Sequence, residues 1–213
     1  MKKLKYKKCL ECEINYIPIE EDLCGVCKEK QNPKVRYSSN STSIVLPTMS
    51  TCRYNGRAVF YVFQSTDMFI LESHKGYIIA PREGKNGVVP HHWYRLNEVK
   101  PDDIIIHGVG GYIRAISVAK GMGYCSQYDD GRLAWKVDCQ YITLKNPIAV
   151  EKFQKEIVKL CAIKRYQPFN KNGTGNQGYL FDIDRDLAKV FLEEAARCNN
   201  ILVGVSQLKW LLE

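Results

Sequence analysis

The sequence has no apolar run of the roughly 18 to 20 residues that a membrane-spanning helix needs. Lysines dominate its first residues, but the apolar segment that completes a secretory signal does not follow them. We therefore expect a cytoplasmic protein with no membrane partner.

The sequence also lacks the motifs of common hydrolases and nucleotide-binding enzymes. It contains no Walker loop, no H-E-x-x-H, no G-x-S-x-G and no P-D…(D/E)-x-K pattern. None of its four histidines stands at zinc-ligand spacing from a second histidine or a cysteine. These absences favour a binding module without catalytic activity of its own. The open alternative is a nuclease with a metal site near Asp102, Asp103, His91 and His92.

Cysteine is abundant by contrast, with nine in 213 residues. The odd total, the paired spacing and the missing signal argue against a disulfide framework. Cys9, Cys12, Cys24 and Cys27 form the pattern C-x2-C-x11-C-x2-C, which suits the tetrahedral thiolate coordination of zinc. We expect one structural Zn²⁺ here, because so short a segment cannot bury a core of its own. A pair of redox C-x-x-C motifs is the alternative.

Composition divides the chain into three parts. Residues 1–36 form the predicted four-cysteine zinc finger or ribbon module. Residues 37–50 are rich in Ser, Thr and Asn and are typical of a linker. Residues 51–213 carry most of the apolar sequence and should fold as one domain.

The second domain alternates short β-branched and aromatic runs with two amphipathic stretches. Predicted strands cover residues 57–63, 76–80, 103–107, 112–119 and 135–141. Predicted helices cover residues 149–163 and 184–198, with a further short turn at 207–212. This pattern predicts an α+β fold in which a small barrel or strongly curved sheet is flanked by helices.

Charge and aromatic content point to nucleic acid. The formal net charge of +8, from 31 Lys+Arg against 23 Asp+Glu, favours a polyanionic partner. Aromatic side chains with polar neighbours can stack on a base that has left the duplex, although packing in the core is the alternative for each of them. The segment 170–180 is rich in Gly and Asn, and either exposes amides to phosphates and base edges or is a plain turn.

A family resemblance joins these features. The stretch His91–His107, followed by Ile113–Ser117, Trp135–Asp138, Tyr141 and Asn146–Ile148, resembles the EVE domain family. EVE domains belong to the PUA-like superfamily, together with YTH and ASCH domains. The segment Asn176–Leu180 resembles part of the EVE-like specificity domains of modification-dependent restriction systems.

This resemblance implies a PUA-like curved β-barrel that reads a modified base. Such domains hold 5-methylcytosine or 5-hydroxymethylcytosine, flipped out of DNA, in an aromatic-walled pocket. Carried over by position, the base pocket would consist of Trp93 and Trp135 as walls, Tyr112 and Tyr141 behind them, and Asp138 or Gln64 at the Watson–Crick edge. The nucleic-acid backbone or the gap left by the base would be contacted by Arg114, Lys171, Asn176 and Gln177.

The implied partners are double-stranded DNA with modified bases and a nuclease domain or subunit. An RNA-binding PUA-like protein is the second interpretation, because PUA-like folds also read RNA, and net charge does not discriminate between DNA and RNA.

Overall fold

The computed structural model describes residues 6–8 and 16–18 as backbone, and residues 51–84, 89–160, 166–200 and 206–212 more fully. Strand β1 (Tyr6–Lys8) pairs antiparallel with β2 (Tyr16–Pro18). Strand β2 lies between the two cysteine pairs of the sequence, and its partner β1 comes from the lysine-rich start of the chain. The predicted zinc ligands Cys9, Cys12, Cys24 and Cys27 and the predicted linker lie outside the described residues.

The main sheet is built from seven strands. They are β3 (Val59–Gln64), β4 (Tyr77–Pro81), β5 (Ile104–Val109), β6 (Tyr112–Ala119), β7 (Tyr124–Gln127), β8 (Leu133–Ala149) and β9 (Leu180–Asp182).

The described helices lie between these strands along the chain or follow the last of them. They are α2 (Thr66–Lys75), α3 (His91–Tyr94), η1 (Arg95–Glu98), η2 (Val150–Phe153), α4 (Gln154–Leu160), α5 (Arg185–Cys198), η4 (Ser206–Leu208) and α6 (Lys209–Leu212). None of the helices within the described ranges is long and apolar enough to cross a membrane.

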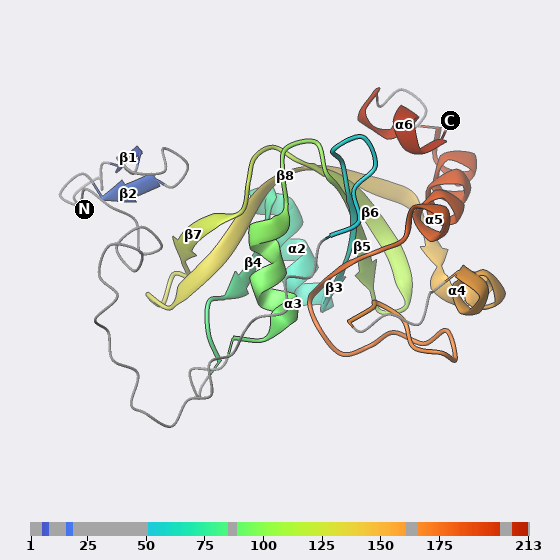
Figure 1. Ribbon diagram of the computed structural model, residues 1–213, viewed down its shortest axis with the longest axis horizontal. Helices are drawn as coiled ribbons and strands as arrows, with labels where there is room; N and C mark the ends of the chain where they lie inside the picture. Colours follow the sequence, from blue (N-terminus) through green and yellow to red (C-terminus); the bar gives the residue numbers. More distant parts are fainter. Residues whose placement is uncertain are drawn as a thin grey trace.

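The strand order of the main sheet is β4-β8-β6-β5-β3-β9, with β7 also paired to β8. Only β3 and β5 run parallel among the described pairs. The 17-residue strand β8 pairs with β4 and β7 through its first part and with β6 through its second. One strand thus belongs to two halves of the sheet, and it arches across the molecule in Figure 1. Register shifts in β5 and β6 add the local bends that curvature requires.

The sheet curls around a first apolar layer, here called the inner cluster. It combines residues of β4, at one end of the strand order, with residues of β9, at the other end, which a flat sheet would keep apart. Its members include Phe60, Val62, Ile78, Leu96, Ile105, Trp135, Val137 and Leu180. The predicted α+β class with a curved sheet is therefore confirmed.

A second apolar layer, the outer cluster, lies on the opposite face of β3, β5 and β6. Tyr61, Ile104 and Ile106 supply its sheet side, and Ile157 of α4 and Phe191 of α5 are among its helix side chains. Figure 1 shows α4, α5 and α6 gathered on this side of the sheet. The helices α4 and α5 lie within the two predicted stretches.

Helix α2 is not anticipated by the sequence pattern. Its apolar residues Phe69, Ile70 and Leu71 are consecutive, and only Phe69 is buried among them, so the stretch lacks a helical period. Both ends of α2 nonetheless carry standard helix-capping residues. Ser65 caps the first turn by accepting a hydrogen bond from the Met68 N–H, and Gly76 ends the helix with φ of 74°.

Candidate functional site

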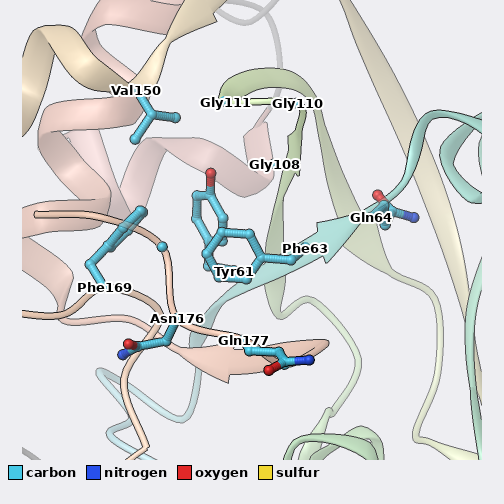
Figure 2. Close-up of a pocket in the computed structure, with 12 residues that line it drawn as sticks. Tyr61, Phe63, Gln64, Gly108, Gly110, Gly111, Val150, Phe169, Asn176 and Gln177 are labelled. Atoms are coloured by element: carbon cyan, nitrogen blue, oxygen red, sulfur yellow. The ribbon is translucent and has the colours of Figure 1, made fainter.

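A cavity of about 420 Å³ opens where β3 ends, beside the turn between β5 and β6. This volume lies in the range of small-ligand sites. Its lining comes from four segments that are distant in sequence: Tyr61, Phe63, Gln64, Gly108, Gly110, Gly111, Val150, Phe169 and residues 175–178. Figure 2 shows the aromatic rings in the middle of this group and the glycine turn on one side.

Three aromatic rings give the cavity its apolar surface. The ring of Tyr61 lies 4.8 Å from that of Phe63 and 5.1 Å from that of Phe169, measured between centroids. The Tyr61 and Phe169 rings meet edge to face, an arrangement that aromatic quadrupoles favour. Tyr61 is only 1% exposed and Phe169 3%, so packing of the outer cluster fixes both rings.

The Tyr61 hydroxyl is the unusual group of this surface. It makes no hydrogen bond with any residue that the structure describes, and its oxygen keeps a small accessible surface at the cavity. A Cβ atom on Gly108 would lie 2.2 Å from this oxygen, so the hydroxyl rests against bare backbone. Figure 2 shows it directed toward Val150 and the glycine turn. Burial raises the pKa of Tyr61 well above its ordinary value, so the phenol stays neutral.

The turn beside this hydroxyl carries no side chains. Gly110 and Gly111 have φ of 58° and 82°, as a two-residue hairpin turn of the primed type demands. A Cβ atom at either position would meet nothing within 4 Å. The Gly111 carbonyl accepts a hydrogen bond from the Val150 N–H at 2.9 Å, which ties the turn to the end of β8.

The loop 167–178 forms the opposite wall, and it is well anchored. Asn170 closes it by accepting hydrogen bonds through Oδ1 from the N–H groups of Asn172 and Thr174. Asn176 donates through Nδ2 to the Gln167 carbonyl at 2.8 Å. A Cβ atom on Gly175 would lie 2.9 Å from the Phe63 ring, so the loop backbone packs directly on that ring.

Behind Gln64 lies a network of buried polar side chains on the inner face of the sheet. The Gln64 amide donates to the Glu72 carboxyl group, and its oxygen lies 2.9 Å from Nδ1 of His107. His107 Nε2 lies 2.7 Å from the Ser117 hydroxyl. The Tyr179 hydroxyl donates to Glu72 at 2.7 Å. Each of these polar side chains has at least one partner.

Burial sets the protonation states of this network. It raises the pKa of Glu72 to about 7, although hydrogen bonds from Tyr179, Gln64 and the Ile79 N–H act in the opposite direction. It also lowers the pKa of His107 to about 3, so this imidazole is neutral. The Gln64 oxygen can only accept, so Nδ1 of His107 carries the proton and Nε2 accepts from Ser117.

Three of the residues singled out from the sequence line the cavity. Asn176 and Gln177, predicted to contact the nucleic-acid backbone or the gap left by the base, lie on its loop wall. Gln64, predicted to read a base edge, lies at its end, with both polar atoms engaged in the network behind it. Gln177 is exposed and makes no hydrogen bond with a described residue.

The two predicted tryptophan walls lie elsewhere, in the inner cluster. Trp135 is 6% exposed, and Trp93 is half-buried and packs against the same cluster. Arg82 lies 5.4 Å from the Trp135 ring centroid, and Tyr94 meets that ring edge-on at 6.2 Å. The Trp135 indole N–H is buried and finds no acceptor among the described residues.

The remaining predicted residues are spread over the sheet. Tyr141 donates its hydroxyl to the Tyr77 carbonyl and faces His107 at 4.4 Å between ring centroids. Asp138 is half exposed and accepts a hydrogen bond from Tyr124.

Two further positions stand at the surface. Tyr112 is 43% exposed, with the Arg114 guanidinium 5.9 Å from its ring centroid. Lys171 is exposed in the loop. The structure therefore brings Gln64, Asn176 and Gln177 together and leaves the other predicted residues outside the cavity.

Tyr61, Phe63 and Phe169 are missing from the residues singled out in the sequence. Tyr61 and Phe63 lie in a run that reads as an ordinary buried strand, and Phe169 precedes the predicted loop. The one available signal is the alternation along β3, which places Tyr61 and Phe63 on the same face at the strand's end.

No cluster of three or more His, Cys, Asp or Glu side chains with metal-binding geometry occurs among the described residues. Asp103 instead pairs with Arg53 at 2.9 Å and accepts hydrogen bonds from the backbone N–H groups of Ala58 and Lys100. Its carboxylate therefore braces the start of β3 and β5.

No protein-family model and no curated protein matches the sequence. Similar solved structures include Rpa0253 from Rhodopseudomonas palustris, with 10% identity and a TM-score of 0.45 over 66% of this chain and 94% of that chain. PSPTO5229 from Pseudomonas syringae is 10% identical, with a TM-score of 0.44 over 65% of this chain and 99% of that one.

A third similar structure is the YTH domain of Zygosaccharomyces rouxii MRB1, solved in complex with N6-methyladenosine RNA. It is 13% identical to this chain, with a TM-score of 0.41, and covers 71% of this chain and 94% of its own.

Proposed function

We propose that this protein binds DNA and reads a modified cytosine, 5-methylcytosine or 5-hydroxymethylcytosine, that is flipped into the cavity at the end of β3. The observation that carries the proposal is the meeting of Gln64, Asn176 and Gln177 at one cavity. They come from two segments more than a hundred residues apart. The sequence resemblance to EVE domains assigns the same three residues to nucleic acid.

The chemistry of the cavity suits a flipped base. Unstacking a base costs a few kcal/mol, which stacking on aromatic surface and hydrogen bonds to the base edge must offset. Phe63 and Phe169 supply the aromatic surface. Asn176 and Gln177 supply amides, and each amide both donates and accepts, as the edge of cytosine does.

The chain would act as the specificity module of a modification-dependent restriction or defence system, with the nuclease on another domain or subunit. The PUA-like assignment and the base-reading role follow from the sequence resemblance to EVE domains. One Zn²⁺ held by Cys9, Cys12, Cys24 and Cys27 would stabilise the N-terminal module, and its lysines would extend the positive surface offered to phosphates.

A binding panel tests this function. Duplexes that differ only in one central base are titrated at a stated salt concentration, with cytosine, 5-methylcytosine, 5-hydroxymethylcytosine or N6-methyladenine at that position. Single-stranded RNA with and without N6-methyladenosine completes the panel. We expect the modified-cytosine duplexes to bind at least tenfold more tightly than the plain duplex. Equal binding across all duplexes would refute base reading, and preference for RNA would favour an RNA-binding protein.

A pair of matched variants tests whether the base binds at the cavity. Gln177→Ala removes an exposed side chain at the cavity rim, and Gln127→Ala removes an exposed glutamine on β7, away from the cavity. We expect only Gln177→Ala to weaken binding, by about tenfold.

A second pair, Phe63→Leu and Trp93→Leu, asks which aromatic surface the base uses. Loss of binding in Trp93→Leu but not in Phe63→Leu would move the base to the tryptophan side.

Metal analysis tests the zinc module. We expect one equivalent of zinc per chain, lost in the double variant Cys24→Ser/Cys27→Ser. If that variant keeps its zinc, the four-cysteine assignment is wrong. If its second domain stays folded while DNA affinity falls, the module belongs to the DNA footprint.

A further inference from the structure

The Tyr61 hydroxyl lies at the cavity, where it keeps a small accessible surface and has no hydrogen-bond partner among the described residues. A ligand that fills the cavity would separate this hydroxyl from water without the protein supplying a bond in exchange. The described residues offer it no acceptor and no donor, although Tyr61 is only 1% exposed. A ligand that reaches the inner end of the cavity would supply the missing bond.

The cavity wall around this hydroxyl is formed by glycine backbone and apolar side chains. Gly108 has no Cβ, and the Tyr61 oxygen occupies the space that a Cβ would need, 2.2 Å from its position. Gly110 and Gly111 present backbone alone, with nothing within 4 Å of the Cβ positions they lack. Val150 faces the hydroxyl from the side opposite the glycine turn in Figure 2. The wall at this end of the cavity therefore combines one polar atom with glycine backbone and apolar side chains.

We propose that the Tyr61 hydroxyl determines the specificity of the cavity by hydrogen-bonding the hydroxyl of a hydroxymethylated base, so that 5-hydroxymethylcytosine is preferred over 5-methylcytosine. This inference rests on the proposed function, because it assumes that a base enters the cavity. A neutral phenol both donates and accepts, and an alcohol is its complement in both roles. A methyl group can do neither and would leave the phenol without a partner.

The preference follows from the asymmetry of hydrogen bonding. A site that offers a buried polar group to a substrate hydroxyl discriminates against the analogue that lacks it, because the protein's own group then stays unsatisfied. One such bond between neutral groups corresponds to about a tenfold difference in affinity.

The decisive variant is Tyr61→Phe. It removes one oxygen and keeps the ring that packs on Phe63, Phe169 and Phe191. Because this oxygen has no partner in the described protein, the variant should unfold at the wild-type temperature or slightly above it. A matched control is Tyr54→Phe, which changes a partly exposed tyrosine that does not line the cavity.

The experiment measures the affinity of wild type and both variants for duplexes with a central cytosine, 5-methylcytosine or 5-hydroxymethylcytosine. We expect wild type and Tyr54→Phe to prefer 5-hydroxymethylcytosine over 5-methylcytosine by about tenfold. We expect Tyr61→Phe to bind both modified duplexes equally and still more tightly than the plain one.

Two results would overturn the inference in distinguishable ways. If wild type reads both modified duplexes and Tyr61→Phe leaves their ratio unchanged, the hydroxyl does not set specificity and the proposed function stands. If wild type does not distinguish any modified duplex from the plain one, the proposed function fails and the inference fails with it.

Discussion

The polar side chains on the two faces of strand β3 differ in their hydrogen bonding. On the inner face, Gln64 belongs to a network in which Glu72, His107, Ser117 and Tyr179 are all hydrogen-bonded. On the outer face, the Tyr61 hydroxyl lies at the cavity and has no hydrogen bond to a described residue. A satisfied network fixes one arrangement of the sheet, whereas an unsatisfied group beside a cavity is available to a ligand. The difference separates structural polar groups from a candidate recognition group on a single strand.

The largest effect should come from removing the outer-face ring altogether. Tyr61→Ala deletes a fully buried side chain at the centre of the aromatic group, and a cavity remains because α4 and α5 cannot collapse into it. We expect the free energy of unfolding to fall by about 4 kcal/mol, measured by urea denaturation. A loss below about 1 kcal/mol would mean that the ring is not packed as described.

The next effect is the pH dependence that Glu72 gives to the inner face. Its pKa is raised in the folded state to about 7 from 4.5, so folding favours the protonated form. The stability that Glu72 contributes is thus complete below pH 4.5 and is lost as the pH rises through 7. We expect wild type to lose about 3 kcal/mol relative to Glu72→Gln between about pH 4.5 and about pH 8.

The comparison with Glu72→Gln isolates this carboxyl group. The buried histidines His91 and His107 have lowered pKa values and therefore oppose the trend in acid, but they are present in both proteins and cancel. Stability curves that run parallel over the whole pH range would show that Glu72 titrates as an ordinary carboxyl.

The smallest effects form the sharpest contrast, since they remove one hydroxyl from each face. Tyr179→Phe removes a hydrogen-bond donor to Glu72 and an acceptor for the Ile79 N–H. This loss should lower the free energy of unfolding by about 2 kcal/mol. Tyr61→Phe removes an oxygen without a described partner, and should change stability by less than about 0.5 kcal/mol. Equal losses in the two variants would erase the distinction between the faces.

The sequence predicts most of the fold, and the exceptions have physical causes. The strands β3, β4, β5, β6 and β8 follow from runs of β-branched and aromatic residues. Helix α2 is not predicted from the sequence, because its apolar residues do not repeat with a helical period. In the structure Ile70 and Leu71 are accordingly 60% and 43% exposed. Strand β8 runs on to Ala149, where a helix is expected to begin, because pairing with β6 holds the chain extended as far as Ala149.

The site is predicted less completely than the fold. The loop with Asn176 and Gln177 stands out because Gly and Asn gather there. Tyr61 does not stand out, since a tyrosine in a buried strand gives no sign in the sequence that its hydroxyl lacks a partner. That property arises only when Gly108, from a segment 47 residues away, comes to lie against it in the parallel pairing of β3 and β5.

The anchoring of loop 167–178 has a consequence for the rate of binding. Its closure by Asn170 and its packing on Phe63 through Gly175 are complete before any ligand arrives. A wall that is ordered in the free protein adds no ordering step to the encounter. If a base binds there as proposed, capture of a base already outside the helix, as in single-stranded DNA, should follow a single kinetic phase that scales with concentration. With duplex DNA, a slower phase would report base flipping in the DNA rather than a rearrangement of the protein.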